Sequence, residues 1–193
     1  MKTSLKTGMA ALLLLLAASC TKDNVNSPSS DCLQASESDE SVTAKHIGDS
    51  FHGGIIFYLD KTGKHGLVAA TADQGVQNAW NNGKNIETFA TGTAIGAGLD
   101  NTNKIVAAQG KTGSYAALLC YNYKVGTYKK WYLPSKDELA LLFEQASVVK
   151  LSEGDYWSSS ETSKSKAWVQ VIGGYHFKYS KSFTLHVRAI SAF

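Results

Sequence analysis

Residues 131–139 read WYLPSKDEL, and this stretch decides how the middle of the chain folds. Proline restricts the residue before it to extended conformations, so Leu133 should end a strand-like segment. Ser135 and Glu138 have the spacing of a capping box, in which each side chain bonds the backbone N–H of the other residue. We therefore expect a helix to begin directly after Ser135, with Leu139 on its inner face.

Strands should lie on both sides of this junction. Residues 54–59 and 67–70 are apolar runs separated by turn residues, which predicts a hairpin. Between the hairpin and the junction, polar residues that favour helix N-termini precede two apolar stretches. The two expected helices span residues 101–108, capped by Asn101 or Thr102, and residues 114–123, capped by Ser114.

The C-terminal third should be mostly strand. A second hairpin is expected around Gly173-Gly174, since both positions tolerate a positive φ. A two-residue turn there would place Trp168 opposite Tyr179 and Gln170 opposite Phe177. The expected strands are residues 156–160, 167–172, 175–181 and 183–189. These patterns predict an α+β domain with two or three short helices, a twisted antiparallel sheet and paired terminal strands.

The N-terminus has the features of a secretion signal. Lys2 and Lys6 precede an apolar run over residues 9–18, which is too short to cross a hydrocarbon core. Small residues then lead into Cys20, an arrangement that resembles the lipobox of bacterial lipoproteins. The resemblance implies cleavage after residue 19 and acylation of Cys20; the alternative is an ordinary signal that ends near a cysteine.

Three segments follow from this interpretation. Residues 1–19 are the signal peptide, residues 20–45 a polar segment that we expect to be a flexible tether, and residues 46–193 the binding domain. Acyl chains on Cys20 would hold the protein in a membrane. By analogy with other lipoproteins, Thr21 favours the outer membrane of a Gram-negative bacterium, and Lys22-Asp23 resembles a surface-export tag.

Charge and cysteine content limit the partners. Without the two lysines of the signal, 17 basic and 16 acidic residues leave a net charge of +1. That balance gives no reason to expect nucleic acid as a partner. Cys120 should be a buried thiol in a helix, and a disulfide between Cys120 and Cys32 is the alternative.

Six motifs follow one another along the chain: GGIIFY (53–58), GLVAA (66–70), GTAIG (92–96), WYLPSKDEL (131–139), YWSSSE (156–161) and VRAI (187–190). In this order they resemble the bacterial surface-domain family named for the C-terminal domain of the Legionella collagen-like adhesin. The resemblance implies a C-type lectin-like fold, and the best-known member of the family is an adhesin for sulfated polysaccharides. This chain lacks the collagen-like repeats that multimerise that adhesin.

Metal and redox chemistry of related superfamily members is not expected here. A calcium-dependent lectin would need a Glu-Pro-Asn or Gln-Pro-Asp type loop, and neither occurs. The formylglycine-generating oxidases need a late cysteine pair, but no cysteine follows Cys120. The related iron enzymes need clustered histidines, whereas the five histidines of this chain are scattered. We expect no cofactor, no metal and no catalysis.

Candidate ligand contacts come from two regions. Trp80, in an irregular Gly- and Asn-rich loop, could stack on a sugar while neighbouring amides bond its hydroxyls; a buried loop anchor is the alternative. Lysines of the C-terminal hairpin could form a basic rim, or could be solvated edge residues. Glu161 is a ligand contact or, like Arg188, part of a structural ion pair. The candidates are Trp80, Asn81, Asn82, Glu161, Tyr175, Lys178 and Lys181, with Lys164 and Lys166 beside them.

The resulting hypothesis is a lipid-anchored cell-envelope binding module, an adhesin or a glycan-capture protein that needs no calcium. Its ligand would be an acidic or sulfated glycan. The alternative is a structural subunit that docks onto another envelope protein. A degenerate oxidase of the formylglycine-generating type is a remote third reading.

Overall fold

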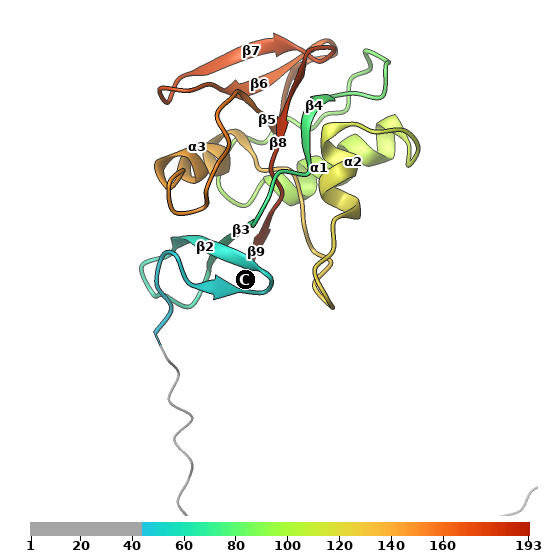
Figure 1. Cartoon of the computed structure of the whole chain (residues 1–193). Helices are drawn as coiled ribbons and strands as arrows, with labels where there is room; N and C mark the ends of the chain where they lie inside the picture. The colour runs from blue at the N-terminus through green and yellow to red at the C-terminus, as the bar shows by residue number, and fades with distance from the viewer. Residues whose placement is uncertain (1–43) are drawn as a thin grey trace, which may run out of the picture. The chain divides into compact units, whose positions relative to one another are not determined.

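The structure is a computed structural model that describes residues 44–193. Cys20, Cys32 and the signal lie outside the described residues, and so does almost all of the expected tether. Within the described part, strands begin and end the chain and three helices lie between them (Figure 1). The domain is therefore α+β, and its strands form two sheets rather than one.

The first sheet has the strand order β1-β2-β3-β9 and is antiparallel throughout. The predicted N-terminal hairpin is confirmed: its two strands pair from Gly54 opposite Ala70 to Leu59 opposite Gly66. A Cβ on Gly54 would lie 2.4 Å from the Ala69 carbonyl oxygen, so only glycine allows this close pairing. The strands are β1 (Ser50–Phe51), β2 (Gly54–Leu59), β3 (Gly66–Ala70) and β9 (Ile190–Ala192).

The second sheet has the strand order β4-β8-β5-β6-β7 and is mostly antiparallel. One pair, Tyr156 opposite His186, joins β5 to β8 in parallel, which corrects the expectation of a purely antiparallel sheet. The strands are β4 (Gly75–Ala79), β5 (Tyr156–Ser163), β6 (Lys166–Gln170), β7 (His176–Ser180) and β8 (Thr184–Val187).

The register predicted for the C-terminal hairpin is wrong by one residue. Trp168 lies opposite Lys178, and Gln170 lies opposite His176. Val171 N–H donates to the Tyr175 carbonyl, so the turn contains three residues, Ile172 and the two glycines, instead of two. A slip of one position exchanges the faces on which the partners of β6 lie.

The predicted capping box is confirmed. Ser135 accepts a hydrogen bond from Glu138 N–H, and Glu138 accepts one from Ser135 N–H, at the start of α3 (Lys136–Glu144). The other two helices start elsewhere than expected: α1 spans Gly98–Gln109 and α2 spans Ala116–Asn122. Asn101 does not cap α1 because its side-chain amide donates to the Gly92 carbonyl at 2.6 Å, inside the domain.

The predicted single last strand over residues 183–189 is in fact a transfer between the two sheets. The chain leaves β8 at Val187, passes through buried Arg188 and Ala189, and enters β9 at Ile190. Strand β9 pairs with β3, so the first and last strands share a sheet but are not neighbours in it, which corrects the expectation that the terminal strands pair. In Figure 1, α3 lies on one side of the β5–β8 pair and α1 and α2 on the other.

Tryptophans occupy the centre of the larger core cluster. Trp80, Trp131 and Trp157 are buried in it, together with Cys120, whose pKa is raised by burial. Trp168, the fourth tryptophan of the chain, is only half-buried. No described helix has both the length and the apolar character to cross a membrane.

Candidate functional site

The structure divides the candidate ligand residues into two groups. Tyr175 and Lys178 are exposed on the C-terminal hairpin, and Asn82 is half-buried. The remaining candidates are buried: Trp80, Asn81, Glu161 and Lys181.

Three of the buried residues form one cluster. The Lys181 ammonium donates to Glu161 Oε1 and lies 4.1 Å from the centre of the Trp80 ring. Burial lowers the pKa of Lys181, and the hydrogen bond and charge of Glu161 oppose that shift without cancelling it. Glu161 also accepts from Thr88 N–H at 2.9 Å. This cluster therefore fastens the loop after β4 to the second sheet.

Trp80 is the anchor of that loop. Its ring is 0% exposed, and its Nε1 donates to the Ser158 carbonyl at 2.8 Å. Sugar stacking on Trp80 is therefore incompatible with this structure, because no part of the ring reaches the surface. The buried-anchor alternative describes the residue correctly.

The neighbouring amides are also engaged within the protein. Asn81 Nδ2 donates to Asn85 Oδ1 at 2.8 Å, and Asn81 Oδ1 accepts from Gly83 N–H. Asn82 bonds Gln109 through both its backbone N–H and its side chain, which docks the loop on α1. These amides hold the loop in shape instead of presenting free donors and acceptors to a sugar.

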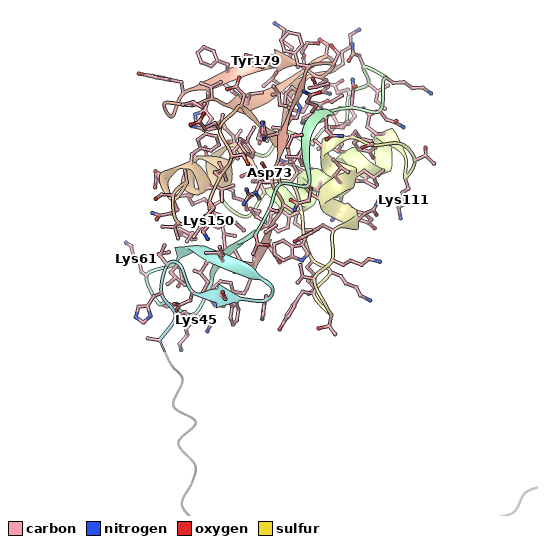
Figure 2. All side chains as sticks on the ribbon, in the orientation of Figure 1. Lys45, Lys61, Asp73, Lys111, Lys150 and Tyr179 are labelled. Carbon is pink, nitrogen blue, oxygen red and sulfur yellow. The ribbon has the colours of Figure 1, made fainter. Side chains whose placement is uncertain are left out.

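Glu161 and Arg188 do not pair with each other. Arg188 Nε donates to Asp73 Oδ1 at 2.6 Å, and Asp73 Oδ2 accepts from the Tyr156 hydroxyl at 2.9 Å. Burial favours the neutral form of Asp73, but the hydrogen bond and charge of Arg188 and the bonds from Tyr156 and His186 outweigh it, so its pKa lies below the ordinary value. Figure 2 shows Asp73 in the middle of the domain, where it joins the two sheets. Both ion pairs are therefore structural.

The exposed group centres on Trp168, which was not among the candidate ligand residues. Lys178 Nζ lies 4.8 Å from the centre of the Trp168 ring, and Lys136 Nζ lies 6.0 Å from it. Lys166 precedes Trp168 by two positions in β6, so it shares the same face of the strand. We call Lys136, Lys166, Trp168, His176 and Lys178 the lysine face.

His176 completes the lysine face. Its ring meets the Trp168 ring edge-on at 6.5 Å between centres, and burial together with the charge of Lys136 lowers its pKa. His176 is therefore mostly neutral at pH 7. Asp137 pairs with Lys136 and offsets part of the positive charge, whereas Lys178 and Lys166 have no acidic partner among the described residues.

The sequence pointed to Lys178 but missed Trp168 and Lys136. Tyr175 is exposed at the hairpin turn, one residue before β7 begins. If a three-residue turn had been assumed in place of the two-residue turn, the sequence would have placed Lys178 opposite Trp168. Lys136 reaches the same ring from the first residue of α3, a tertiary contact with no local signal.

No group of three or more His, Cys, Asp or Glu side chains within residues 44–193 is arranged to hold a metal ion. No protein-family model matches this chain, and comparison with curated proteins finds none that matches it.

Proposed function

We propose that the described domain is a binding module with a C-type lectin-like fold, anchored in the outer membrane by lipid on Cys20, and that it captures acidic glycans without calcium or catalysis. The observation that carries this proposal is the pair of ammonium groups, Lys136 and Lys178, held over the single half-buried ring of Trp168.

The fold part of the proposal is supported by where the motifs lie. GGIIFY and GLVAA occupy the paired strands β2 and β3, and YWSSSE begins β5. WYLPSKDEL carries the confirmed capping box, and VRAI spans the transfer from β8 to β9. The motifs thus coincide with the strand pairings and connections that define the domain.

The binding part follows from electrostatics. Two like charges close together raise the local positive potential, which attracts anionic groups and favours fast association. The aromatic ring stabilises both ammonium groups through cation–π contacts and so holds them in place before a ligand arrives. A sugar carboxylate or sulfate would then bridge Lys136 and Lys178, while Lys166 contacts a neighbouring acidic residue.

The test is a glycan array with residues 44–193, the part of the chain that the structure describes. The array should contain neutral, carboxylated and sulfated glycans, and should be repeated with chelator and at increasing salt. We expect binding of the acidic glycans that weakens with salt and ignores chelator. The variant Lys136→Ala/Lys178→Ala should lose about tenfold in affinity, equivalent to about 1.4 kcal/mol.

A matched control is available at the other end of the domain. Lys61 and Lys64 lie in the β2–β3 turn, far from the hairpin that bears Tyr179 (Figure 2). The variant Lys61→Ala/Lys64→Ala removes the same charge and should bind like the wild type. Equal losses in both double variants would mean that net charge alone attracts the glycan.

A second candidate function, docking onto another envelope protein, is favoured by the opposite face of the same hairpin. Phe177 and Phe183 are each about half exposed, and both pack against Tyr179, with ring centres 6.4 and 5.6 Å apart. Clustered exposed aromatic rings are typical of protein interaction surfaces. The assembly role would be favoured if no glycan on the array bound and if this aromatic face crosslinked to another envelope protein in intact cells.

A further inference from the structure

The surface on which the chain enters the domain is basic. Residues 44–53 and 124–130 contain four lysines and one acidic residue, Asp49. Within residues 44–193, none of these four lysines pairs with an acidic side chain. Asp49 is engaged locally, since its Oδ2 accepts from His46 N–H at 2.7 Å. We use the name basal surface for Lys45, Lys124, Tyr128, Lys129 and Lys130.

Aromatic stacking joins the two segments of the basal surface. The His52 ring lies between two other rings, with its centre 3.8 Å from that of Phe51 and 4.2 Å from that of Tyr128. Lys45 Nζ lies 5.1 Å from the centre of the same Phe51 ring. Val125 and Tyr128 exchange backbone hydrogen bonds of 3.1 and 3.0 Å, so the lysines that flank this pair belong to a tight turn. The four lysines are therefore parts of one continuous surface.

The stack includes a strained residue. His52 has a φ of 51°, which is uncommon for a residue with a Cβ atom. A Cβ on the next residue, Gly53, would lie 2.4 Å from Val125 Cγ1, so the turn before β2 fits directly against segment 124–130. Burial and the charge of Lys45 lower the pKa of His52, which is therefore mostly neutral at pH 7. Strain of this kind is typical of functional surfaces, where the surrounding contacts maintain it.

Charge and aromatic character together fit an anionic lipid surface. Each basic side chain near such a surface strengthens association about fivefold, equivalent to about 1 kcal/mol. Tyrosine is enriched at membrane interfaces because its ring is apolar and its hydroxyl is polar. Tyr128 is 43% exposed, and Ile47, in the same part of the domain, is 41% exposed. The basal surface thus offers lysines for the headgroups and apolar side chains for the boundary below them.

The position of the tether indicates which membrane this is. Residues 21–43 separate Cys20 from the first described residue and can span at most about 80 Å. Lys45 follows that residue directly, so the tether joins the domain at the basal surface. A tether of this length gives a weak second contact an effective concentration near the millimolar range, so docking needs only modest affinity. This step rests on the proposed acylation of Cys20.

We propose that the basal surface docks the domain onto the anionic headgroups of the membrane that holds its acyl chains. Figure 2 shows Lys45 at one end of the domain and Tyr179, in the hairpin of the lysine face, at the other end. In Figure 1 the β6–β7 hairpin likewise lies at the end opposite β2. Docking therefore directs the lysine face away from the bilayer, where it can reach a glycan.

The test uses the chain from residue 20 with Cys20→Ser, so that no acyl group contributes to binding. Flotation measures its association with vesicles rich in phosphatidylglycerol and with vesicles of phosphatidylcholine, which have no net charge. We expect association with the anionic vesicles that weakens as salt is added, and little with the neutral ones. Equal association with both kinds of vesicle, or none with either, would overturn the proposal.

Matched variants separate the basal surface from net charge. One variant replaces the three lysines of residues 124–130 by alanine, and the control replaces three exposed lysines elsewhere. The variants are Lys124→Ala/Lys129→Ala/Lys130→Ala and Lys84→Ala/Lys104→Ala/Lys111→Ala. The first should weaken vesicle association at least about 30-fold, whereas the control should stay within about twofold of the parent chain. Equal losses would contradict a specific surface, and thermal denaturation confirms that both variants are folded.

Spin-labelled lipid reports which end of the domain meets the bilayer. In NMR spectra with phosphatidylglycerol-rich bicelles, the label should broaden the backbone N–H signals of residues 45–53 and 124–130. The signals of β7 should stay sharp. Broadening of β7 instead would assign the membrane contact to the lysine face and would overturn the proposed orientation.

A soluble sulfated glycan tests the other anionic occupant. If it binds the basal surface more tightly than the anionic vesicles do at equal anion concentration, the surface is a second glycan site and the lipid proposal is wrong. The variant of residues 124–130 should bind the glycan array like the wild type. Failure of docking is therefore seen in flotation, and failure of the acidic-glycan proposal is seen on the array.

Discussion

Lys181 and Glu161, 20 positions apart in the sequence, form an ion pair inside the protein, with side chains 0% and 1% exposed. Lys181 follows β7 and Glu161 lies in β5, so the pair joins the end of the hairpin to the centre of the second sheet. The Lys181 ammonium group also donates to the Ile86 carbonyl and lies over the Trp80 ring. The Lys181 side chain is thus enclosed by the domain and does not reach the surface.

Removing one partner of this pair should be strongly destabilising. Glu161→Ala leaves a buried ammonium group unpaired and Thr88 N–H without its acceptor, for which we expect a loss of about 3–5 kcal/mol. Lys181→Met/Glu161→Gln removes both charges and keeps an acceptor for Thr88, so its loss should be clearly smaller. Urea unfolding measures both. As a control, Asp100→Ala breaks the exposed pair with Lys104 and should cost less than about 1 kcal/mol. Similar losses in Glu161→Ala and Asp100→Ala would contradict the buried pair.

Trp80→Phe tests the role of the loop anchor. The variant keeps an aromatic ring beneath Lys181 but leaves the Ser158 carbonyl without its donor, so we expect about 1–3 kcal/mol of destabilisation. The fraction that remains folded should bind acidic glycans like the wild type, because the lysine face is untouched. Thermal denaturation followed by binding below the transition separates the two effects. Complete loss of glycan binding at unchanged stability would mean that Trp80 contributes to the ligand site.

Local sequence signals predicted the elements better than their pairing. Pro134, Ser135 and Glu138 lie within five residues, and the junction that they predict is present because the capping box that defines it is a local interaction. The C-terminal hairpin was placed correctly but its register was not. Gly173-Gly174 fits a two-residue turn as well as the three-residue turn that forms, and nothing in the local sequence distinguishes them.

The candidate site was harder to predict because its residues meet only in three dimensions. Lys178 and Lys181 look alike in the sequence, yet one is exposed and the other is fully buried against Glu161. Arg188 looked like an interruption of one strand, whereas it occupies the transfer between two sheets and bonds Asp73, 115 positions away. Contacts of such long range leave no periodic trace in the chain.

The Asp73–Arg188 pair should make the stability of the domain depend on pH in the acidic range. A carboxyl whose pKa is lowered in the folded state contributes stability above its unfolded pKa of about 3.9, and loses it as the pH falls through the folded value. Wild-type stability should therefore drop below about pH 4. Asp73→Asn should be less stable at pH 7, and its stability should fall less steeply than that of the wild type as the pH is lowered. Urea midpoints from neutral to acidic pH measure both, and parallel curves for the two proteins would contradict the assignment.

Glu138 should behave in the opposite way. Its carboxylate accepts from Ser135 N–H and Gly96 N–H, but burial outweighs these bonds and raises its pKa. A carboxyl with a raised folded pKa contributes less stability as the pH rises from its unfolded value through the folded one. Glu138→Gln cannot ionise, so it should remove this decline. It keeps one acceptor oxygen for Ser135 N–H, but its amide nitrogen takes the place of the oxygen that accepts from Gly96 N–H, so we expect a cost of about 1–3 kcal/mol near pH 7.

Glu138→Ala has no such compensation. Both N–H groups lose their acceptor inside the protein, and we expect a loss of about 2–4 kcal/mol, with fraying at the start of α3. Because Lys136 is the first residue of that helix, its ammonium should also lose its place over Trp168. The alanine variant should therefore bind acidic glycans more weakly than the glutamine variant at a temperature where both remain folded. Equal stability of the two variants would mean that the capping box contributes nothing to the domain.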